Sequence, residues 1–598
     1  MGLIVQKYGG TSVGSVERMQ VVAQRIARTA RAGNDVVVVV SAMGHTTDHL
    51  LAMAHQLTTQ PSPRELDMLL TTGEQVSISL MVMALQAIGC KAISMTGAQV
   101  GMITEPNHTR ARILRIQTGR ISELLKGNHI VVVAGFQGFC NAPYWEITTL
   151  GRGGSDTSAV ALAAALRAER CEIYTDVPGV LTTDPRLVSD ARLLDEITSE
   201  EMLELASLGA QVLHPRAVEI ARNYAVPLVV RSSWLEDPGT SVISPPLPVP
   251  RPIDNIETDR PVDAVYVDNN QARLALLRVP DRPGVAAILF RYFAEAGIDV
   301  DLIIQAIQGI REEQPTNDIA FTVQRSDLAR AIEVARAAAE ALGSCEVVVD
   351  PCPTKISIRG AGIIGRPGVA AQMFTALARA QVNIQMISTS ETCLSCVIAG
   401  VHAETAAKAL CQSFGLRTPV FEEPFIIHPA ETMAVRGVAL DRNQAQMAIL
   451  GVPDQPGIAA RIFDCLAVEG IPVDMIVQSQ RGEATNDIGF TVHRDLVPAA
   501  EKALKLLCDA VGCSGILIRD TVAKLSLVGI GIAGTPGIAA RMFSTLADLG
   551  TNIEMISTST IKVSCIIDQS AAEDAICKVH AAFKLGTGEK VAVEGSKS

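Results

Sequence analysis

The sequence predicts an α/β protein: a mostly parallel sheet in its N-terminal part, followed by a series of small, repeated α/β modules. Short runs of valine and isoleucine alternate with amphipathic segments up to about Pro245. This alternation is typical of parallel strands that are covered by helices on both faces. Beyond that point a Pro-Gly turn that opens an apolar helix recurs four times, which indicates internal duplication.

The composition indicates a large protein that acts on small molecules. Its 598 residues exceed one hydrophobic core, and we expect about three to five domains. A net charge of −12 argues against a nucleic-acid partner or an anionic membrane surface, because both attract clustered Lys and Arg. No apolar run approaches the ~20 residues that span a bilayer, and no secretory signal precedes the first strand, so we expect a cytoplasmic protein without membrane contact.

The 13 cysteines lie scattered among apolar neighbours, as reduced core thiols do. Cys393 and Cys396 have the C-x-x-C spacing of a redox or zinc pair. They occur in an extended run, where residues three apart face opposite sides of a strand. We therefore expect no metal site and no redox pair.

The predicted strands of the N-terminal part are Leu3 to Gln6, Val36 to Val40, Ala92 to Ser94, Ile130 to Ala134, Cys171 to Tyr174 and Val226 to Val230. Ligands of such sheets bind at the carboxyl ends of the strands. The loops that follow these strands are therefore the candidate site.

The first of these loops suits a phosphate group. Lys7 precedes the adjacent glycines Gly9 and Gly10, and hydroxyl side chains and an amphipathic segment follow. The glycines expose backbone N–H groups, and a helix N-terminus carries partial positive charge. The order differs from the P-loop string, in which the lysine follows the glycines, so an ordinary turn remains an alternative.

Three further loops carry polar residues before predicted helices. They are Ser41 to Thr47, Thr71 to Gln75 with Glu74, and Leu150 to Thr157 with Arg152, Ser155 and Asp156. Taken singly, Ser155 and Asp156 could cap a helix and Glu74 could be a first-turn acid. An arginine between glycines is an unusual way to make a turn, so the loops together favour a binding site. Asp176, Asp184 and Arg186 follow another strand and suit either a nucleotide or a solvated turn.

The repeated half consists of a duplicated two-module cassette. Units one and three contain Asp281 and Asp454 at the turn and strands that end in Gln305 and Gln478, whereas units two and four share Asn-Ile at Asn383 and Asn552. The strings Gly360 to Gly365 and Gly529 to Gly534 match G-x-G-x-x-G. We do not expect NAD binding, because the sister units lack this string and ~80 residues are too few for a dinucleotide-binding domain.

The motifs together resemble a known family. VQKYGGTSVGS, SAMGHTTDHL, TTGEQVS, LGRGGSDTSA, YTDVPGV, TTDPR and LHPRA occur in the order found in the aspartate kinases of the amino-acid kinase family, and the repeats PDRPGVAA and NIQMISTSE resemble ACT regulatory modules. The resemblance covers nearly the whole chain, although four modules replace the usual two, as in cyanobacterial forms. It implies a three-layer αβα kinase domain (1–245), a proline-rich linker (246–262) and four ferredoxin-like ACT modules (263–350, 351–428, 429–518 and 519–598).

The resemblance implies transfer of the ATP γ-phosphate to the side-chain carboxylate of L-aspartate, with Mg²⁺ bridging the phosphates. It makes Lys7 and Asp156 catalytic, and it assigns aspartate binding to Ser41, Thr47, Glu74, Arg152, Gly153, Gly154 and Ser155. It assigns ATP binding to Lys7, Tyr8, Gly9, Gly10, Thr175, Asp176, Asp184 and Arg186.

For the modules, the resemblance implies feedback inhibition by lysine and threonine and a homodimer formed through the ACT region. The effector candidates are Asp281, Asp301, Gln305, Asn383, Ile384, Asp454, Asp474, Gln478, Asn552 and Ile553. Helix capping and exposed strand ends are the plain alternative for these residues. For the whole chain, the alternatives are a glutamate 5-kinase, a uridylate kinase and a non-catalytic amino-acid sensor.

Overall fold

The computed structural model describes residues 2–141, 143–208, 212–244, 251–257, 260–306, 316–343, 345–361, 363, 366–421, 434–480 and 485–588. The chain forms two compact units. The N-terminal unit holds Met1–Leu181 and Arg192–Asp259, and the C-terminal unit holds Thr182–Ala191 and Arg260–Lys590. Pro245 to Pro250 of the predicted linker, and Gly362 and Gly365, lie outside the described residues.

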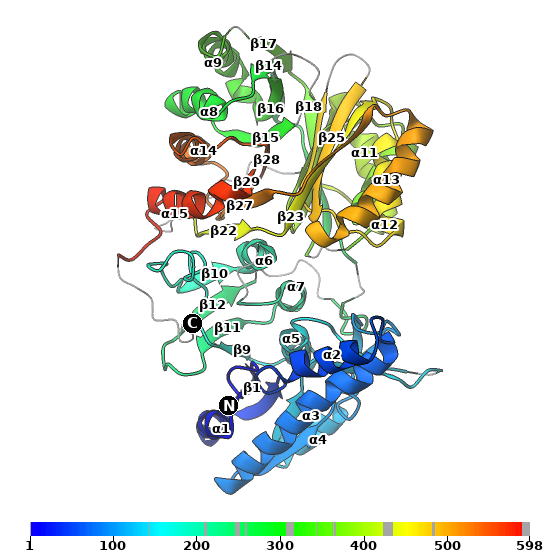
Figure 1. The fold of residues 1–598 in the computed structure, drawn as a ribbon, viewed down its shortest axis with the longest axis vertical. Helices are drawn as coiled ribbons and strands as arrows, with labels where there is room; N and C mark the ends of the chain where they lie inside the picture. The colour runs from blue at the N-terminus through cyan, green and yellow to red at the C-terminus, as the bar shows by residue number, and fades with distance from the viewer. Residues whose placement is uncertain are drawn as a thin grey trace. The chain divides into compact units, whose positions relative to one another are not determined.

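The N-terminal unit is built on an eight-stranded sheet (Figure 1). Its strands, in spatial order, are β10 (Glu196–Thr198), β12 (Thr240–Ile243), β11 (Leu228–Ser232), β9 (Arg170–Thr175), β1 (Leu3–Tyr8), β2 (Asp35–Val40), β6 (Ile130–Ala134) and β3 (Ala92–Met95). The pairs from β11 to β3 are parallel, and β12 runs antiparallel to β11. The predicted parallel-rich sheet is confirmed.

Helices cover both faces of this sheet. Val36, Val38 and Val40 of β2 pack in one core with α1 and α3, while α5 contacts β1, β2 and β9. The helices of the unit are α1 (Val16–Arg31), α2 (Thr46–Leu57), α3 (Pro63–Ala87), α4 (Gly119–Lys126), α5 (Gly154–Leu166), α6 (Ser199–Ser207) and α7 (Pro215–Tyr224). A second, four-stranded sheet consists of β5 (Ile113–Ile116), β4 (Met102–Thr104), β7 (Gln137–Cys140) and β8 (Ile147–Thr149).

Helix α3 is the one described helix that is long and apolar enough to cross a membrane. Half of its most apolar stretch is buried within the protein, and it packs against α1, β3 and β6. These contacts are those of a core helix in a globular domain.

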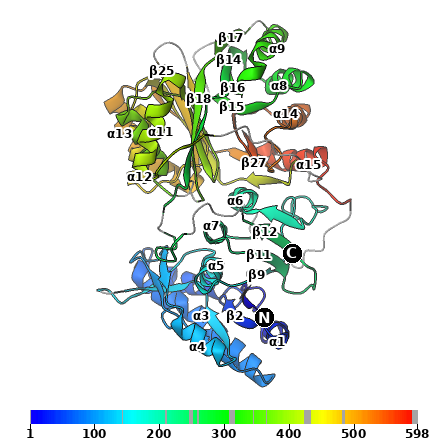
Figure 2. The same ribbon diagram turned by 180° about the vertical axis from the view of Figure 1, so that it is seen from behind.

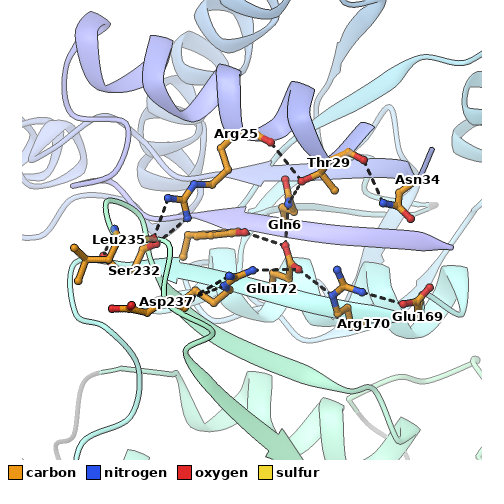
Figure 3. A network of polar contacts seen from close by, with 12 residues as sticks. Gln6, Arg25, Thr29, Asn34, Glu169, Arg170, Glu172, Ser232, Leu235 and Asp237 are labelled. Atoms are coloured by element: carbon orange, nitrogen blue, oxygen red, sulfur yellow. Dashed lines mark hydrogen bonds and ion pairs between the residues drawn. The ribbon is translucent and has the colours of Figure 1, made fainter. Parts of the chain in front are cut away.

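A buried polar network fixes the central strands (Figure 3). The Glu172 carboxylate on β9 accepts hydrogen bonds from Gln6 Nε2 on β1 at 2.8 Å and from the Tyr174 hydroxyl at 3.0 Å. Gln6 Nε2 also donates to Thr29 Oγ1 on α1 at 3.1 Å. Because a buried carboxylate needs such donors, the network fixes the register of β1, whose next residue is Lys7.

The C-terminal unit contains four βαββ-type modules in which strands are exchanged along the chain. Modules 1 and 3 each have four strands of their own. In the described residues module 4 has three strands, and module 2 has three and the short β21 (Val420–Phe421); their sheets also contain β22 (Gly437–Asp441) and β13 (Ala264–Asp268), respectively, which precede modules 3 and 1 in sequence. Our sequence-based ranges placed these two strands in modules 1 and 3. In the structure β13 belongs to the sheet of module 2 and β22 to that of module 4, because each pairs antiparallel with the first strand of that module.

The modules pair as 1 with 4 and 2 with 3. Modules 1 and 4 form one continuous sheet of β17 (Glu346–Asp350), β14 (Gln271–Pro280), β16 (Thr316–Gln324), β15 (Val300–Ala306), β28 (Met555–Ser559), β29 (Lys562–Asp568), β27 (Val522–Val528) and β22. Module 2 contributes β19 (Ile384–Thr389), β20 (Cys393–Ala399), β18 (Pro353–Arg359), β13 and β21 (Val420–Phe421), and module 3 contributes β24 (Ile476–Gln480), β25 (Thr485–His493), β23 (Gln444–Pro453) and β26 (Gly515–Arg519).

The sheets of the two pairs face each other, and the helices lie on the outside (Figures 1 and 2). Leu302, Ile304, Met386, Val477 and Met555 form the apolar layer between the sheets. The helices are α8 (Val285–Glu295), α9 (Leu328–Ala341), α10 (Val369–Arg379), α11 (Ala403–Ser413), α12 (Ile458–Val468), α13 (Val497–Val511), α14 (Ile538–Asp548) and α15 (Ala572–Ala582). Short 3₁₀ turns, η1 (Arg325–Asp327), η2 (Gly400–His402), η3 (Arg494–Leu496) and η4 (Gln569–Ala571), precede α9, α11, α13 and α15.

Candidate active site and effector pockets

The loop after β1 is held against the loop after β2. Lys7 lies within β1, and the chain turns at Gly9 and Gly10. The Gly44 amide donates to the Gly10 carbonyl at 3.0 Å, and a Cβ on Gly10 would lie 2.8 Å from the Ala42 carbonyl oxygen. Gly10 is therefore required for the close approach of the two loops.

Lys7 faces the first turn of α5. Its Nζ lies 2.6 Å from Asp156 Oδ1, and the two side chains are only 12% and 11% exposed. Helix α5 begins at Gly154, and Gly153 precedes it with a positive φ of 68°. The turn thus aims a carboxylate at the lysine at the carboxyl end of the sheet, where a ligand of a parallel sheet binds.

Tyr8, the last residue of β1, is buried in the core of the unit. Its side chain is fully buried and stacks on Tyr174 with ring centroids 4.6 Å apart. Because successive side chains of a strand point to opposite faces, Tyr8 points away from the face that Lys7 occupies. A contact of Tyr8 with a nucleotide beside Lys7 would therefore come from its backbone, and its predicted role in ATP binding stays a prediction.

Glu74 lies within helix α3 and not in a loop. The string Thr-Thr-Gly predicted a break, but the helix continues because Gly73 packs closely on Ala42, where a Cβ would lie 2.9 Å from the alanine methyl. The Ala42 amide donates to Glu74 Oε1 at 3.2 Å. Oε2 is buried without a hydrogen-bond partner among the described residues. Burial raises the pKa of Glu74 to about 7, so the site favours a cationic partner for this carboxylate.

The remaining predicted aspartate contacts lie in the loop after β2, in α2, and at the start of α5. Ser41 follows β2 and donates its amide to the Tyr8 carbonyl at 3.1 Å. Thr47, half-buried, is the second residue of α2. Arg152 is exposed, whereas Gly154 and Ser155 are buried in the start of α5.

The predicted nucleotide contacts divide between the two units. Thr175 ends β9, and its hydroxyl donates to the exposed Asp176 at 3.1 Å. Asp184 and Arg186 belong to Thr182–Ala191, which is part of the C-terminal unit. They form an ion pair with each other at 2.7 Å.

Two equivalent pockets lie between paired modules. In the first, between modules 1 and 4, Asn552 Nδ2 donates to Asp281 at 2.9 Å, and Gln305 Nε2 donates to the Ile553 carbonyl at 2.8 Å. In the second, between modules 3 and 2, the corresponding bonds run from Asn383 to Asp454 at 2.9 Å and from Gln478 to the Ile384 carbonyl at 2.9 Å.

The pockets enclose ≈ 340 and ≈ 350 Å³ of space, part of which is open to solvent. Asn486 also donates to Asp454, at 2.8 Å. It was not among the predicted contacts, although the Thr-Asn-Asp run shared by units one and three contains it.

Asp301 and Asp474 do not line these two pockets. Asp301 lines a neighbouring cavity between modules 1 and 4, and the assignment of both acids as effector ligands stays a prediction. Asp301 of module 1 forms an ion pair with Lys355 of module 2, and Asp474 of module 3 forms one with Lys524 of module 4. Although burial opposes ionisation, Lys524 and Lys562 hold the pKa of Asp474 below its usual value. The two acids thus link the module pairs to each other.

The glycine strings have a packing role. A Cβ on Gly360 would lie 2.1 Å from the Pro261 carbonyl oxygen, and one on Gly529 would lie 2.2 Å from that of Ala434. The glycines allow the chain that enters each exchanged strand to pass close by. Cys396 is buried in β20, and burial raises the pKa of its thiol, whereas Cys393 is partly exposed.

The fold and the site together define a class of protein: a small-molecule kinase with appended amino-acid-sensing modules. The amino acid kinase family model matches residues 2–232, and the ACT domain model matches 356–414, 448–509 and 525–583. The crystal structure of aspartate kinase from Synechocystis is 53% identical, with a TM-score of 0.83, and the match covers 99% of this chain and 100% of that one.

Two curated relatives point the same way. The aspartokinase of Mycolicibacterium smegmatis is 47% identical over 416 residues, and that of Pseudomonas aeruginosa is 48% identical over 422; each match covers 70% of this chain and 97% or 99% of the relative. The chain belongs to the aspartokinase family. It is a kinase that phosphorylates aspartate and is allosterically regulated through its ACT modules, which sets aside the glutamate kinase, uridylate kinase and sensor alternatives.

Proposed function

We propose that Lys7 and Asp156 form the phosphoryl-transfer centre, with Lys7 neutralising charge on the transferring γ-phosphoryl group. The observation that carries this proposal is the ion pair of 2.6 Å between them beside the glycine turn. The side-chain carboxylate of aspartate is already ionised at pH 7 and needs no general base. The protein contributes positioning and charge neutralisation, which dominate phosphoryl transfer.

The aspartate substrate is held at its two other charged groups. Glu74 pairs with the substrate ammonium, because its buried Oε2 lacks a protein donor among the described residues. The exposed Arg152 guanidinium binds the α-carboxylate in two parallel hydrogen bonds. Ser41, Thr47, Gly153, Gly154 and Ser155 complete this pocket.

The nucleotide lies across the turn at Gly9 and Gly10, with Thr175 and Asp176 of the same unit as further contacts. The described residues contain no group of three His, Cys, Asp or Glu side chains that could hold a metal alone. We expect Mg²⁺ to be held mainly by phosphates and water, close to Asp156, which pairs with Lys7. When bound, the ion adds charge neutralisation at the phosphates.

Feedback inhibition operates through the two module pockets, with lysine and threonine as the proposed effectors. Asp281 and Asp454 offer each pocket one carboxylate for the ammonium group of a free amino acid. Titration of each amino acid, alone and mixed, against the initial rate tests the effectors. Inhibition by neither would contradict the assignment.

A route from module 4 to the nucleotide contacts supports this regulation. The Thr182 hydroxyl lies 2.9 Å from His580 Nε2 on α15 and donates to the Leu585 carbonyl at 3.1 Å. The Val438 amide of β22 donates to the Thr182 carbonyl at 2.8 Å. Module 4 therefore holds the segment that carries Asp184 and Arg186.

We propose that the protein forms a homodimer and acts in the cytoplasm. Val420 and Phe421 are exposed on the edge strand β21, which suits a homodimer formed through the ACT region, and light scattering of the intact chain tests it. All 13 cysteines are free, as expected in the reducing cytoplasm.

A further inference from the structure

The motif at His214 to Ala217 contacts the loop that carries Arg152. No role was assigned to this motif from the sequence. His214 is the N-cap of α7, and Arg216 is its second residue. The loop in question runs from Leu150, which is buried, through Gly151 to Gly153.

Arg216 uses its donors in four hydrogen bonds. Nη1 donates to the Leu150 carbonyl, and Nη2 donates to the Ala111 carbonyl at 2.8 Å. Nε and Nη2 also form a bidentate pair with Glu257, at 2.7 and 2.9 Å. A guanidinium has a rigid, planar set of donors, so the position of Glu257 fixes the direction from which Arg216 grips Leu150.

Glu257 is itself fixed in place. Its side chain is 5% exposed, and it accepts a hydrogen bond from the Ile113 amide at 2.7 Å. The Glu257 amide donates to the Ile113 carbonyl at 3.0 Å, so the backbone pairs with β5. The part of the predicted linker around Glu257 therefore belongs to the N-terminal unit.

His214 closes the other end of the loop. A Cβ on Gly153 would lie 2.2 Å from the His214 ring. Burial and the neighbouring Arg216 lower the pKa of His214, and its Nδ1 accepts the Arg216 amide at 3.3 Å. Leu150 and Gly153 are thus both held by one helix start, and Arg152 lies between them.

We infer that Arg216 and Glu257 are positioning residues for aspartate binding: they set the backbone of Leu150 to Gly153 so that Arg152 meets the substrate carboxylate. This rests on the proposed role of Arg152. A shift of about 1 Å at a positioned group can cost on the order of a hundredfold in rate. The pair acts through the loop and touches neither substrate.

Steady-state kinetics of the full chain tests the inference with Glu257→Gln and Arg216→Lys. Glu257→Gln keeps the shape of the side chain but removes its charge. Arg216→Lys keeps the charge but loses the planar set of donors. Both variants should raise the KM for aspartate by about tenfold or more and leave the KM for ATP within about twofold. A generally loosened fold would change both KM values together.

Glu200→Gln is the matched control. Glu200 forms an ion pair of 3.0 Å with Arg222, which lies on the same helix α7 and is comparably buried. This variant should leave both KM values unchanged. The inference is overturned if Glu200→Gln raises the KM for aspartate as much as Glu257→Gln does. It is also overturned if this KM is unchanged in both Glu257→Gln and Arg216→Lys.

Arg152→Lys, measured in parallel, separates the role of Arg152 in binding aspartate from the role of Arg216 and Glu257 in positioning it. If the KM for aspartate rises in Arg152→Lys but not in Glu257→Gln, the positioning role of Arg216 and Glu257 is refuted, and the role of Arg152 stands. If the KM for aspartate is unchanged in Arg152→Lys, the role of Arg152 is refuted, and the positioning role of Arg216 and Glu257 is refuted with it.

Discussion

The Lys7 ammonium lies 2.6 Å from the Asp156 carboxylate, although the two residues are far apart in the sequence. Lys7 is the last residue but one of the central strand β1, and Asp156 lies in the first turn of α5. Both side chains are nearly buried, so the pair is weakly screened by solvent.

Asp156→Asn should lower kcat by about a hundredfold or more, because an amide cannot hold the lysine at the reacting centre. The KM for ATP should change far less. Measurement of kcat at saturating substrates checks this, with circular dichroism as a folding control. A kcat within threefold of the parent (roughly 0.6 kcal/mol) would remove Asp156 from the centre.

Glu74 should impose a pH dependence on aspartate binding. Because burial raises its pKa to about 7, the group is increasingly protonated below that pH and cannot pair with the substrate ammonium. The KM for aspartate should therefore rise as the pH falls from 8 to 6, and Glu74→Gln should raise it at all pH values without this slope. A parallel slope in the variant would contradict the assignment.

The same shift predicts a gain in stability for Glu74→Gln. A folded-state pKa raised from 4.5 to about 7 means that the native state binds the extra proton, so wild-type stability falls as the pH rises through this window. At pH 8 the variant should be more stable by up to about 3 kcal/mol, and the gain should shrink towards pH 5. Urea unfolding at both pH values measures it, and a gain independent of pH would point to another cause.

A single substitution in one module pocket should weaken effector binding to that pocket and leave the other pocket intact. Asp281→Asn and Asp454→Asn each remove the carboxylate from one pocket, so each should weaken the binding of one effector by at least about tenfold. The other effector should keep its affinity, and the uninhibited rate should not change. Calorimetric titration of each variant with lysine and with threonine checks this. Loss of both effectors in either variant would contradict independent sites.

The contact between Thr182 and His580 should transmit feedback. Thr182→Val removes a buried hydroxyl that bonds both α15 and the Leu585 carbonyl. The variant should need several-fold more effector for half-inhibition at an unchanged uninhibited rate. Ser189→Ala, an exposed position in the same segment, is the control. Unaltered inhibition in Thr182→Val would exclude this route.

The sequence predicted those features that local patterns determine. Lys7, Gly9 and Gly10 stand out because a strand end, two glycines and hydroxyl groups are contiguous. Asp281 and Asn552 stand out because duplication repeats them, although the sequence does not show that they meet across modules 1 and 4.

The features that the sequence did not predict depend on distant contacts. The sequence predicts a loop at Glu74, since the packing of Gly73 on Ala42 involves the loop after the distant strand β2. The sequence suggests an effector contact for Asp301, and only the fold shows its ion pair with Lys355. Arg216 and Glu257 form no local pattern, so only the fold shows their pairing.

The most direct test of the central claim is ADP release in a coupled assay, with aspartate, glutamate, carbamate and UMP compared as acceptors for the wild type and for Lys7→Ala. Aspartate alone should support rapid turnover, and Lys7→Ala should reduce it by about a thousandfold or more, with unchanged circular dichroism and unchanged amino-acid binding to the ACT modules. Preference for glutamate, or retained turnover in a folded Lys7→Ala protein, would contradict the account.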